Sequence, residues 1–379
     1  MKILLLGEYS NLHATLAKGL KALGQEVVVA SNGDFWKNYP RDIDLQRAPG
    51  KSGGAKLIMK IYSLLPKLKD YDIVQLINPM FVELKAKRIL PIYKQLRKQN
   101  KKMFLLGAGM DYYWVSVNST TMPLRYSDFN IGKTLRTNPD ALKERADWIN
   151  TDKEKLNKYI ANDCDGIITM LYEYYACYHP LFPDKTTFIP APIEIEKTGN
   201  AVAADKGDAE NVGADSETDK YDGILKIFIG ISKGRSEYKG TDIMLKAAQR
   251  LNQKYPDKTQ LRIAEGVPFE EYKTLMEGSD IILDQLYSYT PAMNALLAMS
   301  KGIIVAGGGE PENYDILGET ALRPIVNVLP TEQSVFEQLE QLVLHPERVP
   351  QMKKDSIEYI RKHHDYLQVA QKYLDYWRH

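Results

Sequence analysis

Short apolar runs alternate with amphipathic helical stretches along most of the chain, and this alternation constrains the fold more than any other feature. The run Ile3–Leu6 is followed by leucines at spacings of three and four between Leu12 and Leu23, and then by the apolar run Val27–Ala30. Such spacing predicts a helix with one buried face, which Gly24 ends. A strand, a helix and a second strand in this order predict a parallel sheet.

The alternation continues through the first half and begins again in the second. Further strands are predicted at Ile73–Ile77, Met103–Leu106, Gly166–Thr169, Leu225–Ile229, 260–264, Ile281–Asp284 and Gly302–Ala306. Helices are predicted at about 241–254, 269–278 and 292–300, and the chain ends in a long helical stretch whose last part Asp365 can cap. A length of 379 residues suffices for two cores. The expected fold class is therefore α/β, with two doubly wound, Rossmann-like domains that face a cleft.

Residues 198–222 separate the two halves by their composition. They hold seven acidic residues and two lysines among many Ala, Gly, Ser and Asn. Such a segment buries too little apolar surface to offset its ordering entropy, so we expect it to be disordered. The expected organisation is an N-terminal domain at 1–190, an interdomain segment with this acidic linker at 191–222, a second domain at 223–360, and a C-terminal helix at 361–379.

Several classes of protein and site are disfavoured. No stretch approaches 18 consecutive apolar residues, as a transmembrane helix requires, and the apolar start Met1–Gly7 is too short for a signal peptide. Two cysteines cannot form a disulfide framework or a four-cysteine zinc site, and none of the six histidines has zinc spacing. We therefore expect a cytoplasmic protein with no metal site and no cofactor.

The charges are unevenly distributed. Residues 1–102 hold 19 Lys and Arg against 8 Asp and Glu, a net of +11, whereas the remainder holds 31 against 41, a net of −10. Eight of the basic residues lie in the helical-looking segment from Lys85 to Lys102. A basic amphipathic helix can contact an anionic membrane or a phosphate-bearing acceptor, although a solvated helix face is an equally simple interpretation. No aromatic-rich basic motif accompanies the charges, so we expect no nucleic-acid partner.

The loop from Gly230 to Gly240 is the strongest candidate binding motif. It follows the first strand of the second domain and leads into a helix at Thr241. Glycines allow close approach of the backbone to a ligand, and a helix N-terminus attracts anions. Arg235 and Lys239 add two cations that suit a pyrophosphate. A Gly-rich connector with solvated side chains is the alternative.

The run from Gly234 to Asp242 resembles the Arg/Lys pyrophosphate loop of GT-B glycosyltransferases, especially the nucleotide-sugar enzymes of family 4. Other stretches are similar to segments of that family: the opening unit Gly7–Val29, the "I-P-N-P-I-D"-like segment Phe188–Glu194, and the "E-A-M-A-x-G-x-P-V-V"-like block Ala298–Val305. The helix through Trp377 is similar to the family's C-terminal helix, which crosses back onto the first domain. The resemblance covers nearly the whole chain outside 198–222.

The resemblance implies roles for individual residues. Arg235 and Lys239 would neutralise the nucleoside diphosphate as the glycosidic bond breaks, and we count both as catalytic candidates. Gly7, Gly234 and Gly240 would lie beside the donor. The donor would be a nucleotide sugar, UDP- or GDP-linked, which is a substrate and not a cofactor.

One departure from family 4 concerns its E-x7-E pattern, whose two glutamates hold the donor sugar and the ribose. This chain has Tyr289 and Leu297 at those positions. Tyr289 keeps a polar group for the donor, Asn294 is the candidate for the ribose, and Glu310 in a glycine-rich loop is a candidate replacement carboxylate. Asp111 follows a first-domain strand and could hold an acceptor hydroxyl or act as base. Ordinary loop, helix or capping residues, and for Glu310 a solvated acid, are the alternatives.

The sequence thus predicts a glycosyltransferase that moves a sugar from a nucleotide-sugar donor to a glycan or lipid-linked acceptor, in cell-surface polysaccharide synthesis. We expect it in the cytoplasm, with peripheral contact to the inner membrane face through the basic first domain. A non-catalytic nucleotide-sugar-binding or scaffold protein of the same fold is the rival, and a nucleotide-sugar epimerase is a second.

Overall fold

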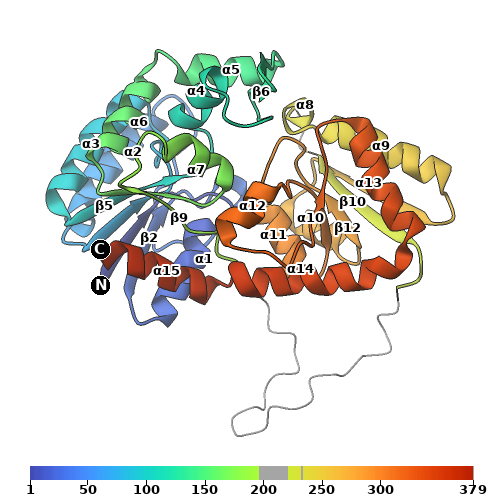
Figure 1. Ribbon diagram of the computed structural model, residues 1–379. Coiled ribbons are helices and arrows are strands. Elements are labelled where there is room, and N and C mark those ends of the chain that lie inside the picture. The colour runs from blue at the N-terminus through green and yellow to red at the C-terminus, as the bar shows by residue number, and fades with distance from the viewer. Residues whose placement is uncertain (196–220, 232–233, 379) are drawn as a thin grey trace, which may run out of the picture.

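Two parallel sheets, each covered by helices, form the two halves of the protein (Figure 1). The computed structural model describes residues 1–195, 221–231 and 234–378. Most of the segment 198–222, for which the sequence predicts disorder, lies outside the described residues. Every neighbouring pair of strands in the two sheets is parallel, which confirms the predicted α/β class.

The first sheet has seven strands in the order β3-β2-β1-β4-β5-β8-β9. In chain order they are β1 Lys2–Leu6, β2 Glu26–Ser31, β3 Ile43–Asp44, β4 Ile73–Leu76, β5 Lys102–Gly107, β8 Gly166–Thr169 and β9 Thr186–Phe188. The helices of this half are α1 Leu12–Ala22, α2 Gly53–Leu64, α3 Ala86–Gln99, α4 Tyr112–Thr120, α5 Pro139–Trp148, α6 Asp152–Asp163 and α7 Tyr172–Tyr178. The strand order reverses direction between β1 and β4, so the loops after these strands open at one crevice.

The second sheet has five strands in the order β11-β10-β12-β13-β14. They are β10 Leu225–Ile231, β11 Thr259–Glu265, β12 Ile281–Leu283, β13 Ile304–Gly307 and β14 Val326–Asn327. The helices are α8 Ser236–Lys239, α9 Thr241–Lys254, α10 Phe269–Met276, α11 Met293–Ser300, α12 Pro311–Leu317, α13 Glu332–Leu344, α14 Val349–His363 and α15 Tyr366–Arg378. Here the order reverses between β10 and β12, which places residues 234–240 beside the loop after β12.

The last helix, α15, crosses back onto the first half, as the sequence predicts (Figure 1). The Oδ1 of Asp365 accepts hydrogen bonds from the backbone N–H groups of the first turn and caps the helix. Contact between α15 and α1 is so close that a Cβ on Gly19 would lie 2.5 Å from the carbonyl oxygen of Tyr366. At the other end, the buried Trp377 ring packs 6.2 Å from the ring of Phe104.

The segment between α4 and α6 holds structure that the sequence analysis did not predict. It forms a short antiparallel hairpin of β6 (Asn130–Ile131) and β7 (Thr134–Leu135), followed by α5. Aromatic residues of this segment belong to an apolar cluster that also includes Tyr289 of the second half. The segment therefore links the two halves at the side of the cleft.

Among the described residues, no helix combines the length and the apolar character that crossing a membrane would require.

Candidate functional site

The loop between β10 and α9 brings both predicted phosphate-binding cations to one turn. Gly234 and Gly240 both have positive φ, +74° in each case, which favours glycine because L side chains rarely adopt that conformation. At Gly240 a Cβ would also lie 2.6 Å from the Cβ of Leu286. This conformation lets the single turn of α8 end at Lys239 and α9 begin at once, with Arg235 at the start of the turn.

Lys239 lies mostly buried beside a carboxylate of the neighbouring loop. Burial lowers the pKa of its ammonium, and Arg235 lowers it further, whereas the charge of Asp284 acts in the opposite direction. The Asp284 carboxyl follows β12, and its burial raises its pKa although Lys239 favours the charged form. Lys239 and the exposed Arg235 place two cations here, near the carboxylates of Asp284 and Asp128. The partial burial of Lys239 strengthens its attraction to an anionic group such as a phosphate.

Asn294 lies at the start of α11 and contacts Asp284, the carboxylate beside Lys239. Its Nδ2 donates a hydrogen bond to the hydroxyl oxygen of Tyr272, at 2.8 Å, and its side chain also bonds to Asp284. The structure thus brings Asn294 into one cluster with Asp284 and Lys239, where the sequence analysis expected a ribose contact. It does not test that role.

The first half contributes the opposite wall through the loops after β1 and β2. Gly7, with φ +85°, allows the chain to turn where a Cβ would lie 2.2 Å from the Cγ2 of Ile77. In the loop after β2, Lys37 donates a hydrogen bond to Asp34 at 2.6 Å, and its charge lowers the pKa of Lys239. The loop after β2 therefore lies within electrostatic range of Lys239 and adds a third cation to this region.

The carboxylate of Glu8, beside this wall, supports α1. It is 1% exposed and accepts hydrogen bonds from the backbone N–H groups of His13 and Ala14 at 3.2 and 2.8 Å. Burial raises the pKa of Glu8 to about 8, with a smaller contribution from the charge of Asp34.

Asp111 has a structural role that the sequence left as an alternative. It is fully buried and caps α4, where Oδ1 accepts a hydrogen bond from the backbone N–H of Trp114 at 2.8 Å. The hydroxyl of Tyr178 donates to Oδ2 at 2.9 Å. Burial raises the pKa of Asp111 to about 7. These contacts occupy both oxygens, so the geometry favours a cap over a base that reaches an acceptor.

Tyr289 and Glu310 take part in contacts between the two halves. Tyr289 is 1% exposed, its hydroxyl oxygen accepts a hydrogen bond from the backbone N–H of Arg125 at 2.6 Å, and its ring lies 5.0 Å from that of Tyr126. Glu310 is 4% exposed and receives hydrogen bonds from Arg125, at 2.8 Å, and from the Tyr126 hydroxyl. The interpretation of Glu310 as a solvated loop acid is therefore wrong.

Two further buried groups bind the halves together, and the sequence analysis identified neither. Glu173 of α7 accepts bonds from the backbone N–H groups of Tyr289 and Thr290 at 2.7 and 3.1 Å, as well as from two nearby hydroxyls. The guanidinium of Arg136, after β7, donates to the carbonyl oxygens of Glu237 and Tyr238 at 2.8 and 3.2 Å. Arg136 therefore holds α8, the turn that carries both predicted cations.

Comparison with solved structures identifies the architecture. Sucrose-phosphate synthase from Thermosynechococcus elongatus matches over 100% of this chain and 98% of its own, with a TM-score of 0.61 and 14% sequence identity. HepE from Anabaena, in complex with UDP and glucose, matches across 99% of this chain and 98% of its own, with a TM-score of 0.55 and 12% sequence identity. The chain has the GT-B fold. No protein-family model and no curated protein matches the sequence.

The GT-B fold is shared by proteins of more than one activity. A putative UDP-N-acetylglucosamine 2-epimerase from Listeria monocytogenes matches over 99% of this chain and 95% of its own, with a TM-score of 0.53 and 12% identity. At such identities the likeness establishes the fold alone. The argument for function must therefore come from the residues of the cleft.

Proposed function

We propose that this GT-B chain is a glycosyltransferase that moves a sugar from a nucleotide-sugar donor, UDP- or GDP-linked, to a glycan or lipid-linked acceptor. The observation that carries the proposal is the position of Arg235 and Lys239. Both lie on the turn before the 14-residue helix α9, at the point where the second sheet reverses its strand order. The complex of HepE with UDP and glucose, which has the same fold, supports a nucleotide sugar as ligand.

The proposed chemistry follows from charge. As the bond between the sugar and the diphosphate breaks, negative charge builds up on the leaving group. Lys239 is mostly buried, so its charge is less screened than that of a solvated lysine. Fixed cations at this position stabilise the transition state more than the ground state, and the N-terminus of α9 adds its dipole.

The acceptor is proposed to enter from the side of the first half, where the loops after β1 and β2 form the facing wall. A lipid-linked acceptor and a role in cell-surface polysaccharide synthesis would agree with the basic character of α3. The structure narrows down which basic residues in and after α3 could contact a membrane. Arg97 forms an ion pair with Asp165 at 2.5 Å, and Lys101 with Asp72 at 2.6 Å. Lys87, Arg88 and Lys98 of α3 are solvent-exposed, so they are better placed than the paired Arg97 and Lys101 to contact an anionic surface.

A second candidate function is nucleotide-sugar binding without transfer. It is favoured by the absence of carboxylates at Tyr289 and Leu297, and by the burial of Tyr289 between the two halves. Binding of a nucleotide sugar is common to both candidates, so turnover distinguishes them.

The test begins with calorimetric titration of the full chain with UDP, GDP and ADP and their glucose or mannose conjugates. Arg235→Ala and Lys239→Ala should each weaken binding of the preferred nucleotide by about 10–150-fold, since a hydrogen bond from a charged donor contributes about 1.5–3 kcal/mol. Lys246→Ala is the matched control, because it removes an exposed positive charge from α9. Unchanged affinity in both loop variants would refute the nucleotide site. Slow hydrolysis of the bound donor supports the transferase. If the donor binds but is neither hydrolysed nor transferred to any acceptor, the binding protein is supported.

A further inference from the structure

The helix α2 presents apolar side chains to solvent as well as to the core. Leu57 and Ile61 are each 2% exposed and pack into the core of the first half. On the outer side of the helix, Met59 is 65% exposed and Tyr62 is 47% exposed, and neither belongs to an apolar cluster of the described residues. Helix α2 therefore has a second apolar face that the described part of the chain leaves open to solvent.

This outer face is a continuous stripe. Its members are exposed apolar residues at successive spacings of four, three and four, which places them on one side of a helix. The 3₁₀ turn η2 (Leu65–Lys67) continues directly from α2 and carries the last of them. The stripe consists of Ala55, Met59, Tyr62 and Pro66. Single exposed apolar residues are common on protein surfaces, whereas an aligned group of them indicates a docking surface.

The segment that contains the stripe carries positive charge only. Residues 45–69 hold six Lys and Arg and no Asp or Glu. Lys56, Lys60 and Lys67 each follow a stripe residue by one position, so they form a row along one edge of the stripe. Lys60 pairs with Asp44 at 3.1 Å, whereas the exposed Lys56 and Lys67 form no ion pair among the described residues. The apolar stripe is thus bordered by cations that can meet an anionic partner.

The combination of stripe and lysines indicates the chemistry of this partner. An apolar stripe beside a row of lysines is typical of helices that lie in a membrane interface. There the apolar side chains enter the boundary of the acyl chains, while the lysines meet the phosphates of anionic lipids. A second copy of this chain fits less well, because a two-fold axis would place the lysines of one stripe against those of the other. The charge therefore favours a lipid surface over a dimer.

The exposed cations of α3 lie on the same side of the first sheet as α2. The connections from β3 to β4 and from β4 to β5 run in the same direction along the sheet, and right-handed crossovers place their helices, α2 and α3, on one face. Helix α1, whose connection runs in the opposite direction, packs with α15 on the other face. Attraction through α3 and insertion through α2 can therefore act on the same surface.

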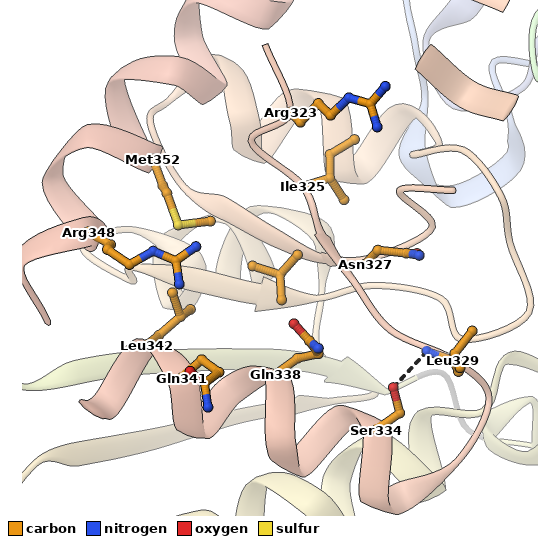
Figure 2. A pocket seen from close by; sticks show the side chains of 11 residues that line it. Arg323, Ile325, Asn327, Leu329, Ser334, Gln338, Gln341, Leu342, Arg348 and Met352 are labelled. Carbon is orange, nitrogen blue, oxygen red and sulfur yellow. Dashed lines mark hydrogen bonds between the residues drawn. The ribbon is translucent and has the colours of Figure 1, made fainter. Parts of the chain in front are cut away.

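The exposed Leu329 of the second half offers a comparison. It is 51% exposed and lines a cavity of about 440 Å³ against the edge strand β14, between α13 and α14 (Figure 2). It lies between β14 and α13, outside any helix, and no lysine lines the cavity. A single exposed leucine of this kind is normal on a protein surface, so Leu329 serves as the control for the stripe.

We propose that the outer face of α2 docks on an anionic lipid bilayer and inserts Met59 and Tyr62 into its interface. The inference rests on the membrane contact proposed above, to which it adds apolar insertion beside the attraction between charges. It does not depend on whether the chain transfers a sugar, because the face belongs to the first half and contains no residue of the proposed nucleotide site.

The first test places an environment-sensitive nitrobenzoxadiazole dye at position 59 of the full chain. The two native cysteines, Cys164 and Cys177, are buried, so Met59→Cys provides the accessible thiol. Vesicles of phosphatidylglycerol and phosphatidylcholine should raise the dye emission at least twofold, and lipids with spin-labelled acyl chains should quench it. The same dye on Leu329→Cys is the matched control, and its emission should stay unchanged.

The second test removes the insertion without changing the charge. Met59→Ser combined with Tyr62→Ser should weaken binding to the anionic vesicles at least tenfold, because burial of even one large apolar side chain changes an equilibrium by about that factor. The melting temperature and the UDP affinity should remain those of the wild type, since both side chains are exposed. Leu329→Ser should leave vesicle binding within twofold. A wild type that binds vesicles but not UDP would count against the proposed function alone.

Three outcomes overturn the proposal. The dye at position 59 fails to respond to anionic vesicles, or the double serine variant binds them as tightly as the wild type does. In the third outcome, the dye responds to an acidic polypeptide such as polyglutamate and not to vesicles, which would make the face a docking site for protein.

Discussion

Replacing Arg136 by lysine tests whether a residue outside the proposed nucleotide site positions it. The Arg136 guanidinium is 9% exposed, donates to the carbonyl oxygens of Glu237 and Tyr238, and lies 3.5 Å from the centre of the Tyr287 ring. Lysine keeps the charge but has neither the planar fork nor the stacking surface. We therefore expect Arg136→Lys to loosen α8 without changing the net charge.

The size of the effect follows from these contacts. Each hydrogen bond from the charged donor to a carbonyl of α8 contributes about 1.5–3 kcal/mol, and a desolvated cation–π contact contributes about 2 kcal/mol. Lysine can retain one of the two bonds but loses the other and the stacking contact, so the expected loss in free energy of unfolding is about 3.5–5 kcal/mol. Because α8 ends at Lys239 and Arg235 is its N-cap, UDP affinity should fall at least tenfold.

The assay combines urea unfolding, monitored by circular dichroism, with calorimetric titration of the protein with UDP. Lys133→Ala is the control, because Lys133 is an exposed cation on the same hairpin. It should change stability by less than about 0.5 kcal/mol and leave UDP affinity unaltered. If Arg136→Lys retains the stability and the affinity of the wild type, the inference that Arg136 positions the turn is refuted.

Three further predictions address other parts of the molecule. Glu173→Gln removes the charge that strengthens the hydrogen bonds from the backbone N–H groups of Tyr289 and Thr290, and should lower the urea-unfolding free energy by about 1–2 kcal/mol. Burial lowers the pKa of His364 to about 3, so the unfolded state binds more protons below pH 6.5 and stability falls as pH drops from there. His364→Asn should make this decline shallower by about 1.4 kcal/mol per pH unit between pH 6 and 4.5, and an unchanged slope contradicts the assignment. The wild type should sediment with anionic vesicles at low salt, and the combined changes Lys87→Glu, Arg88→Glu and Lys98→Glu should abolish this; equal sedimentation with neutral vesicles rejects a charge-driven contact.

The sequence predicts the central strands well because they are short apolar runs with clear punctuation, whereas the short strands β3, β9 and β14 are not predicted. β8 has the predicted bounds, and β1 differs by one residue. Helical spacing of its apolar face and Asp365 before it also predict the last helix itself. Its return to the first half is implied by the resemblance to GT-B glycosyltransferases and not by the spacing.

The contacts between the halves could not be predicted in this way. Arg136 binds backbone carbonyls more than 100 residues away, and any residue type can supply a carbonyl. Glu310 is neutralised by Arg125, from a segment whose fold has no strong hydrophobic period. Of the predicted site, Arg235, Lys239 and Asn294 share one side of the cleft, whereas Asp111 caps a helix and Tyr289 packs against the first half.

The return of α15 has a consequence for how the chain folds during synthesis. The first half makes its last strand with Phe188, but the helix that covers α1 begins only at Tyr366, about 180 residues later. At a ribosomal rate of roughly 5–20 residues per second, the surface around Gly19 stays uncovered for about 9–36 s. During this interval the nascent first half exposes the groove in which Ala370 and Trp377 will be buried, and it offers a binding surface to chaperones until translation supplies the missing helix.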